Sequence, residues 1–85
     1  MSDPVDRLSE QPPSAKLAFL VLEREGSLTQ RGIGEESMLS ARTVRYALSR
    51  LESVGLIEAE ISFRDARQRI YSLSETGEAV TRADR

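Results

Sequence analysis

Residues 40–54, SARTVRYALSRLESV, are the stretch that decides the fold. Their apolar members recur at the i, i+3, i+4, i+7 spacing of an amphipathic helix, namely Val44, Ala47, Leu48, Leu51 and Val54. Ser40 can cap the first turn, and Gly55 can end the last one. The sequence therefore predicts a helix that buries one face and exposes a polar one.

The exposed face of this helix is the first candidate functional surface. At 100° per residue, Arg42, Tyr46, Ser49 and Ser53 point away from the apolar stripe, and Arg45 and Arg50 flank it. The face carries no acid before Glu52. It can be a DNA-reading surface or an ordinary solvated face, and Arg50 can equally pair with a nearby carboxylate.

Two further helices are predicted before this one. The first runs from Ala15 to Glu25 with Ser14 as its cap, and the second, short one runs to about Ser37 with Thr29 as its cap. Residues 1–13 contain three prolines and no apolar periodicity, so they are predicted to be a flexible arm. The expected buried stripe of the first helix is Leu17, Leu20 and Val21, widened by Phe19 and Leu22.

After Gly55 the apolar period changes to two, which indicates strands. Residues 57–63 and 69–73 alternate in this way around a charged turn, so they predict a β-hairpin. Ser74 can then cap a last helical segment from Glu75 to about Arg82. Tyr71 is expected in the core.

This order of elements is that of a winged helix-turn-helix, an α+β fold with a three-helix core, a β-hairpin wing and here a short C-terminal helix. Residues 14–85 would form this one domain. Helix 40–54 would enter the major groove of double-stranded DNA, and wing 63–69 would lie on the minor groove or the backbone. The candidate DNA-binding residues are Ser40, Arg42, Thr43, Arg45, Tyr46, Ser49, Arg50, Arg64, Arg67 and Arg69.

Composition argues against several other functions. The chain of 85 residues has no Cys and no His, so the usual metal and haem ligands and the commonest catalytic bases are missing. No enzyme activity, metal or cofactor is expected, and Glu35-Glu36 is interpreted as a solvated face. The N-terminus, MSDPVDRLSE, does not resemble a signal peptide, and the longest apolar run is too short for a membrane span. A cytoplasmic protein is expected.

The net charge of −2 conceals a local bias. Residues 31–70 hold seven arginines against six acids, whereas the rest of the chain has five basic residues against eight acids. Arginine outnumbers lysine eleven to one. This usage suits bidentate contacts to phosphates and bases, although a GC-rich genome or adaptation to high salt explains it as well.

From about Leu28 to Gly77 the sequence resembles the MarR-type winged-helix transcriptional regulators. LTQRGIGEESMLSARTVRYALSRLESVGLIEAE is similar to their helix-turn-helix, and RDARQRIYSLSETG is similar to their wing and the segment that closes it. Asp65 and Arg67 match the acid and the second arginine of the family's wing tip, and the match continues through Leu73, Ser74, Glu75 and Gly77. The resemblance implies a DNA-binding regulator.

Departures from that family limit what the resemblance implies. Ala66 stands in place of the first wing arginine, for which Arg64 or Arg69 could substitute. Met38 stands where the turn usually has glycine, which predicts a different turn. Because the long terminal helices of the family are mostly missing, a small-molecule effector is not implied. The alternative function is a winged-helix protein-protein interaction module in a larger assembly.

A homodimer is also expected, through the first helix and the terminal segments. One module buries only about 600 to 1,000 Å² on DNA, so a two-fold dimer would supply affinity and specificity. Phe19 and Leu22 are the candidate contacts, with core packing as the alternative interpretation.

Overall fold

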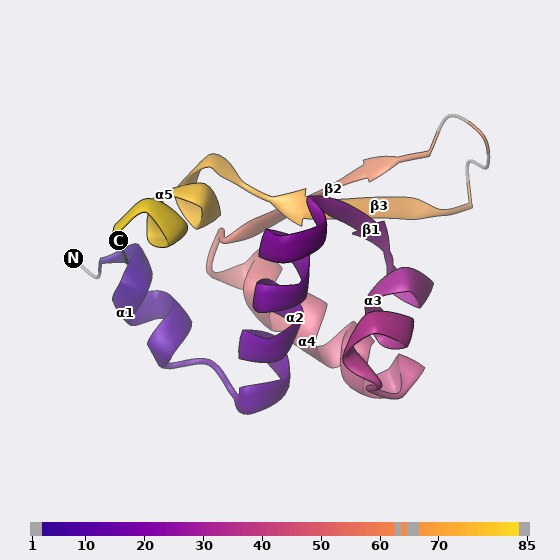
Figure 1. Cartoon of the computed structure of the whole chain (residues 1–85), viewed down its shortest axis with the longest axis horizontal. Helices are drawn as coiled ribbons and strands as arrows, with labels where there is room; N and C mark the ends of the chain where they lie inside the picture. Colours follow the sequence, from indigo (N-terminus) through magenta and orange to yellow (C-terminus); the bar gives the residue numbers. More distant parts are fainter. Residues whose placement is uncertain (1–2, 63, 65–66, 84–85) are drawn as a thin grey trace.

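The computed structural model describes residues 3–62, 64 and 67–83. In chain order these residues form α1 (Pro4–Ser9), α2 (Pro13–Glu25), β1 (Ser27–Thr29), α3 (Gln30–Ser37), α4 (Ala41–Ser53), β2 (Ile57–Ile61), β3 (Arg69–Leu73) and α5 (Glu75–Ala83). Figure 1 shows α2, α3 and α4 packed together, the hairpin of β2 and β3 extending beyond them, and α1 beside α5 at the opposite end. The predicted winged helix-turn-helix is confirmed.

Helix α4 is the predicted recognition helix. The Ser40 hydroxyl accepts a hydrogen bond from the Thr43 N–H at 3.2 Å and so caps the first turn. Gly55 follows the C-cap residue with a φ of 75°, a left-handed conformation that costs glycine little. The predicted inner face is buried by Val44, Ala47, Leu48 and Leu51.

Helix α3 begins and ends as predicted, at Gln30 and Ser37, but the turn that follows it is not the one expected. The Gly32 N–H donates to the Thr29 hydroxyl at 3.1 Å. Met38 then adopts the left-handed conformation, with a φ of 62°, that glycine would adopt more cheaply. The expectation of a different turn is therefore wrong. The Met38 side chain is 91% exposed. The strain of this conformation is therefore confined to the backbone of Met38 itself.

Helix α2 buries a different stripe from the expected one. Its N-cap is Pro12 rather than Ser14, because Pro13 occupies the first helical turn, where a missing N–H costs nothing. Leu17 and Leu20 are 38% and 57% exposed, so their assignment to the core was wrong. The buried residues are instead Ala15, Ala18, Phe19, Val21 and Leu22.

Phe19 and Leu22 are 1% and 0% exposed, which contradicts their prediction as dimer contacts. Both belong to the core cluster that side chains from α3, α4 and the sheet complete in the described part of the chain. The alternative interpretation of these two residues as core residues is the correct one.

The sheet has the strand order β1-β3-β2, and both pairings are antiparallel. Tyr71 of β3 lies opposite Leu28 of β1 on one side and Ala59 of β2 on the other, and its side chain is buried as predicted. Strand β1 was not predicted from the sequence. Ile61, at the outer end of β2, is exposed because the hairpin runs past the helices there.

The two terminal helices pack against each other. The segment expected to be a flexible arm instead contains α1. The Asp3 carboxylate caps the first turn of this helix, because it accepts a hydrogen bond from the Val5 N–H at 3.0 Å. Ser74 caps α5 as predicted, since its hydroxyl accepts from the Gly77 N–H at 3.1 Å. In the described residues, every helix is too short or too polar to cross a lipid bilayer.

Candidate nucleic-acid interface

The outward face of α4 carries the predicted cluster of polar side chains. Arg42, Arg45, Tyr46 and Ser49 are all exposed. They face solvent because the opposite side of the helix is buried against α2 and the sheet. The face is therefore available to a ligand as large as a DNA duplex.

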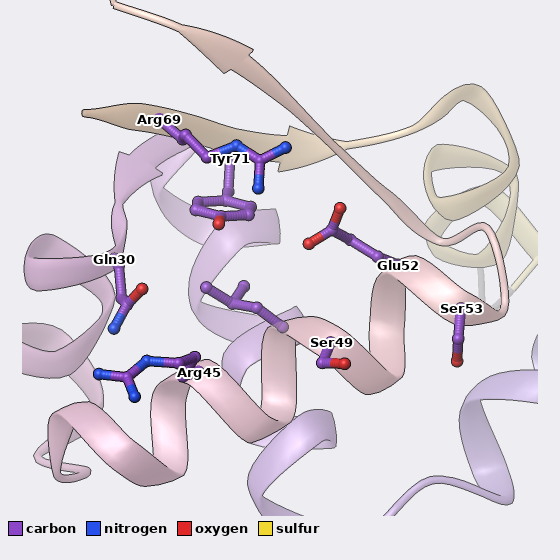
Figure 2. Close-up of a pocket in the computed structure, with 8 residues that line it drawn as sticks. Gln30, Arg45, Ser49, Glu52, Ser53, Arg69 and Tyr71 are labelled. Atoms are coloured by element: carbon purple, nitrogen blue, oxygen red, sulfur yellow. The ribbon is translucent and has the colours of Figure 1, made fainter. Parts of the chain in front are cut away.

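A hollow separates this face of α4 from the sheet (Figure 2). Arg45 and Ser49 come from α4, Arg69 and Tyr71 from β3, and Gln30 from the start of α3. In the close-up, Arg45 lies beneath Gln30, and Arg69 extends beside the Tyr71 ring. The remaining lining residues are Leu48, Glu52 and Ser53.

Arg45 and Arg69 give this hollow its positive charge. They come from segments far apart in the sequence, and each reaches the same hollow. Within the described part of the chain, neither forms an ion pair, because no carboxylate oxygen lies within 4.0 Å of its guanidinium nitrogens. Both can therefore present several N–H donors to a phosphate or a base edge.

Two polar residues of the site were missed by the sequence analysis. Gln30 lines the hollow beside Arg45, and its Nε2 donates to the Ala41 carbonyl at 3.4 Å, so it joins α3 to the first turn of α4. Arg31 lines an adjoining hollow together with Arg67 and Arg69. The Thr29 cap was the available signal, because it places both residues in the exposed first turn of a helix.

The N-terminus of α4 adds a second anchoring element. The Ser40 hydroxyl donates to the Thr43 hydroxyl at 3.0 Å while it accepts from the Thr43 N–H. These two predicted residues thus hold each other at the exposed start of the helix. Helix N-termini attract anions because unpaired N–H groups and the helix dipole point outward there.

The wing carries the remaining predicted arginines. The Ser62 N–H donates to the Gln68 carbonyl at 2.9 Å and continues the hairpin beyond β2. Arg64, Arg67 and Arg69 are exposed along this part of the chain. The predicted roles of Phe63, Asp65 and Ala66 lie outside the described residues.

Arg50 differs from the other predicted site residues on α4. Its Nε donates to the Gln11 Oε1 at 3.1 Å, and it does not line the hollow. Its predicted contact with DNA therefore stays a prediction, and the structure adds an intramolecular partner for its guanidinium. Glu52, by contrast, does line the hollow, and its carboxylate gives one end of it a negative charge.

A family model described as a winged helix-turn-helix DNA-binding domain matches residues 20–58. This range contains α3 and α4 and ends in β2. No curated protein matches the sequence at a significant level.

Solved structures extend this similarity to nearly the whole fold. The PcaV transcriptional regulator from Streptomyces coelicolor, solved with its natural ligand, is 29% identical, with a TM-score of 0.78 over 86% of this chain and 52% of that one. The overoxidized AbfR bound to DNA is 30% identical, with a TM-score of 0.79 over 94% of this chain and 60% of that one. The chain therefore has a winged helix-turn-helix fold that is similar to that of the MarR-type regulators.

The S. aureus MepR-DNA complex shares this MarR-type fold, with 20% identity and a TM-score of 0.80 over 95% of this chain and 66% of that one. At this identity the likeness concerns the fold alone. The chain thus spans between 52% and 66% of the length of these three structures.

Proposed function

We propose that this chain binds double-stranded DNA sequence-specifically and serves as the DNA-reading part of a transcriptional regulator. The observation that carries the proposal is the positive hollow between α4 and β3, which Arg45 and Arg69 both line without an ion-pair partner in the described residues. A helix of this kind fits the major groove, which is about 12 Å wide. Two solved relatives of the same fold, AbfR and MepR, are bound to DNA.

The exposed arginines divide between two roles in this proposal. Arg42 and Arg45 on α4 reach base edges or adjacent phosphates in the major groove, where arginine pairs bidentately with guanine. Arg64, Arg67 and Arg69 anchor the wing on the backbone or minor groove, and Arg31 anchors the start of α3. Ser40, Thr43, Tyr46 and Ser49 supply shorter contacts around α4.

The same proposal assigns no catalytic role to the chain. The hydroxyl groups that line the hollow belong to Ser49, Ser53 and Tyr71, and the sequence has no His to activate them. The proposal requires no cofactor or small-molecule effector. We also propose a cytoplasmic location, because a DNA-binding role requires access to the chromosome.

A titration of fluorescent random-sequence duplex at about 50 and 200 mM salt tests the proposal. If three or four phosphates are neutralised per subunit, log K falls against log salt with a slope of roughly −2.7 to −3.6. A binding constant that does not depend on salt, or the absence of binding to any duplex, would contradict the proposal. The second of these results would favour the alternative function as a protein-protein interaction module.

A homodimer remains a prediction. Phe19 and Leu22 cannot form its contacts, because both are buried in the core of the chain. Two copies on a palindromic duplex would read half-sites about 34 to 36 Å apart. Sedimentation of the chain with such a duplex would show two copies per site, and one copy per site would exclude the dimer.

A further inference from the structure

Gln11 is the buried polar side chain that the proposed DNA interface does not use. It lies in the link between α1 and α2 and is 5% exposed. Burying an amide is costly unless its donor and acceptor both find partners. The partners of Gln11 therefore show what the protein gains from burying it.

The Gln11 amide joins two helices that are distant in sequence. Its Nε2 donates to the Arg7 carbonyl of α1 at 3.1 Å, and its Oε1 accepts from the Arg50 Nε of α4 at 3.1 Å. The hydrogen bond from Arg50 is charge-assisted, which makes it stronger than one between neutral groups. One side chain thus ties the last turn of α1 to the last turns of the recognition helix.

A second contact repeats the connection. The Arg7 Nη1 donates to the carbonyl of Val54, the C-cap residue of α4, at 3.4 Å. The negative end of the helix dipole also stabilises the Arg7 guanidinium at this position. Arg7 and Gln11 therefore hold the same end of α4 from the same short segment of chain.

We propose that Gln11 is a positioning residue that fixes the C-terminal end of α4 through Arg50 and thereby sets the orientation in which the helix enters the DNA groove. The inference rests on the proposed function. Small displacements at one end of a rigid helix shift every side chain along it, and hydrogen bonds to bases tolerate little misplacement. Gln11 raises DNA affinity without contacting DNA, and α1 is part of the DNA-reading machinery rather than an arm.

The test compares Gln11→Met, which keeps the length of the side chain and removes both hydrogen bonds, with Gln11→Glu, which keeps an acceptor for Arg50. Val21→Ala serves as the control, because Val21 is buried on α2 and does not line the hollow. The affinity for one duplex is measured far below the unfolding temperature, where every variant is folded. A residue that only stabilises the fold would not change affinity under these conditions.

We expect Gln11→Met to weaken binding about fivefold, the change in an equilibrium constant that loss of the one hydrogen bond to Arg50 produces. Gln11→Glu should recover most of the loss, Val21→Ala should bind as the wild type, and the salt slope should stay the same in all variants. Affinity that is unchanged in Gln11→Met, or lost equally in Val21→Ala, would overturn the inference.

Amide hydrogen exchange in the last turn of α4 tests the same contact without DNA. Exchange at residues 50–54 should be faster in Gln11→Met than in Val21→Ala, and equal rates would overturn the inference. If the wild type binds no duplex, the proposed function is wrong. The exchange rates still show, independently of DNA, whether Gln11 holds the C-terminal end of α4.

Discussion

Arg45 and Arg50 are both exposed and lie little more than one turn apart on α4, yet their side chains have different surroundings. Arg45 opens into the hollow beside β3 with no carboxylate within 4.0 Å in the described residues, and Arg50 is bonded to the buried Gln11 of the N-terminal segment. The part of α4 around Arg45 is thus open to a ligand, whereas the C-terminal part around Arg50 is held by the N-terminal segment of the chain. The comparison teaches that an exposed arginine on this helix can serve a contact within the protein.

The largest effect is expected from Gly77→Ala in α5, the helix that packs against α1. A Cβ at Gly77 would collide with the main-chain carbonyl oxygen of Leu56, which cannot move aside as a side chain would. We expect the free energy of unfolding to fall by about 3 kcal/mol, the upper part of the usual range for overpacking. Urea denaturation followed by circular dichroism measures the loss.

The same substitution in α3, the helix whose first residue lines the hollow, gives the matched control. A Cβ at Gly32 would meet the Leu28 Cδ2 at 3.1 Å, at the flexible end of a side chain. Alanine is also preferred to glycine inside a helix by roughly 0.5 to 1 kcal/mol, so Gly32→Ala should leave stability nearly unchanged. Equal losses in both variants would show that the close contact of α5 with Leu56 has no special role.

The next effect concerns DNA affinity. Arg45→Ala removes a guanidinium from the hollow, and we expect it to cost roughly 1 to 3 kcal/mol of binding free energy while stability stays within about 0.5 kcal/mol. Arg24→Ala is the control, because Arg24 pairs with Glu25 and Glu36 on an exposed surface away from the hollow. Fluorescence anisotropy with one duplex measures both variants, and a loss for Arg24→Ala as large as for Arg45→Ala would move the interface elsewhere.

Met38→Gly should stabilise the turn that sets α4 against α3. Glycine adopts the left-handed conformation of this position without the roughly 1 to 2 kcal/mol that other residues lose there, although its greater freedom in the unfolded chain offsets part of the gain. We expect a net rise of about 0.5 to 1 kcal/mol in the free energy of unfolding. A lower melting temperature would mean that the exposed Met38 side chain makes a stabilising contact.

The smallest effect tests the acidic end of the hollow. Glu52→Gln removes the carboxylate that faces the hollow but keeps the shape of the side chain. Phosphates nearby should then bind more tightly by about 0.5 kcal/mol, the usual size of an exposed charge interaction. Anisotropy at low salt would show the gain, and weaker binding would mean that Glu52 itself orients an arginine at the interface.

The sequence predicted those parts of the fold whose signals are local. The spacing of Val44, Leu48 and Leu51 and the caps Ser40 and Thr29 predicted both helices of the helix-turn-helix. Each of these signals depends on residues within a few positions of one another. For the same reason, the exposed face with Arg45 could be identified before the structure was known.

Features that depend on distant partners could not be predicted in this way. Strand β1 has only three residues, and it exists because it pairs with β3, more than 40 positions away. Arg50 finds its partner Gln11 39 positions away. The exposure of Leu20 likewise follows from how α2 is rotated against the core, since periodicity alone allowed either stripe.

The salt dependence of DNA binding in Arg45→Ala and Arg50→Ala tests the division of α4 most directly. Each phosphate contact contributes about 0.9 to the slope of log K against log salt. We predict that Arg45→Ala makes the slope shallower by about one unit, while Arg50→Ala weakens binding and keeps the wild-type slope. The opposite pattern, with the slope altered by Arg50→Ala and unaltered by Arg45→Ala, would contradict the assignment of the two ends of the helix.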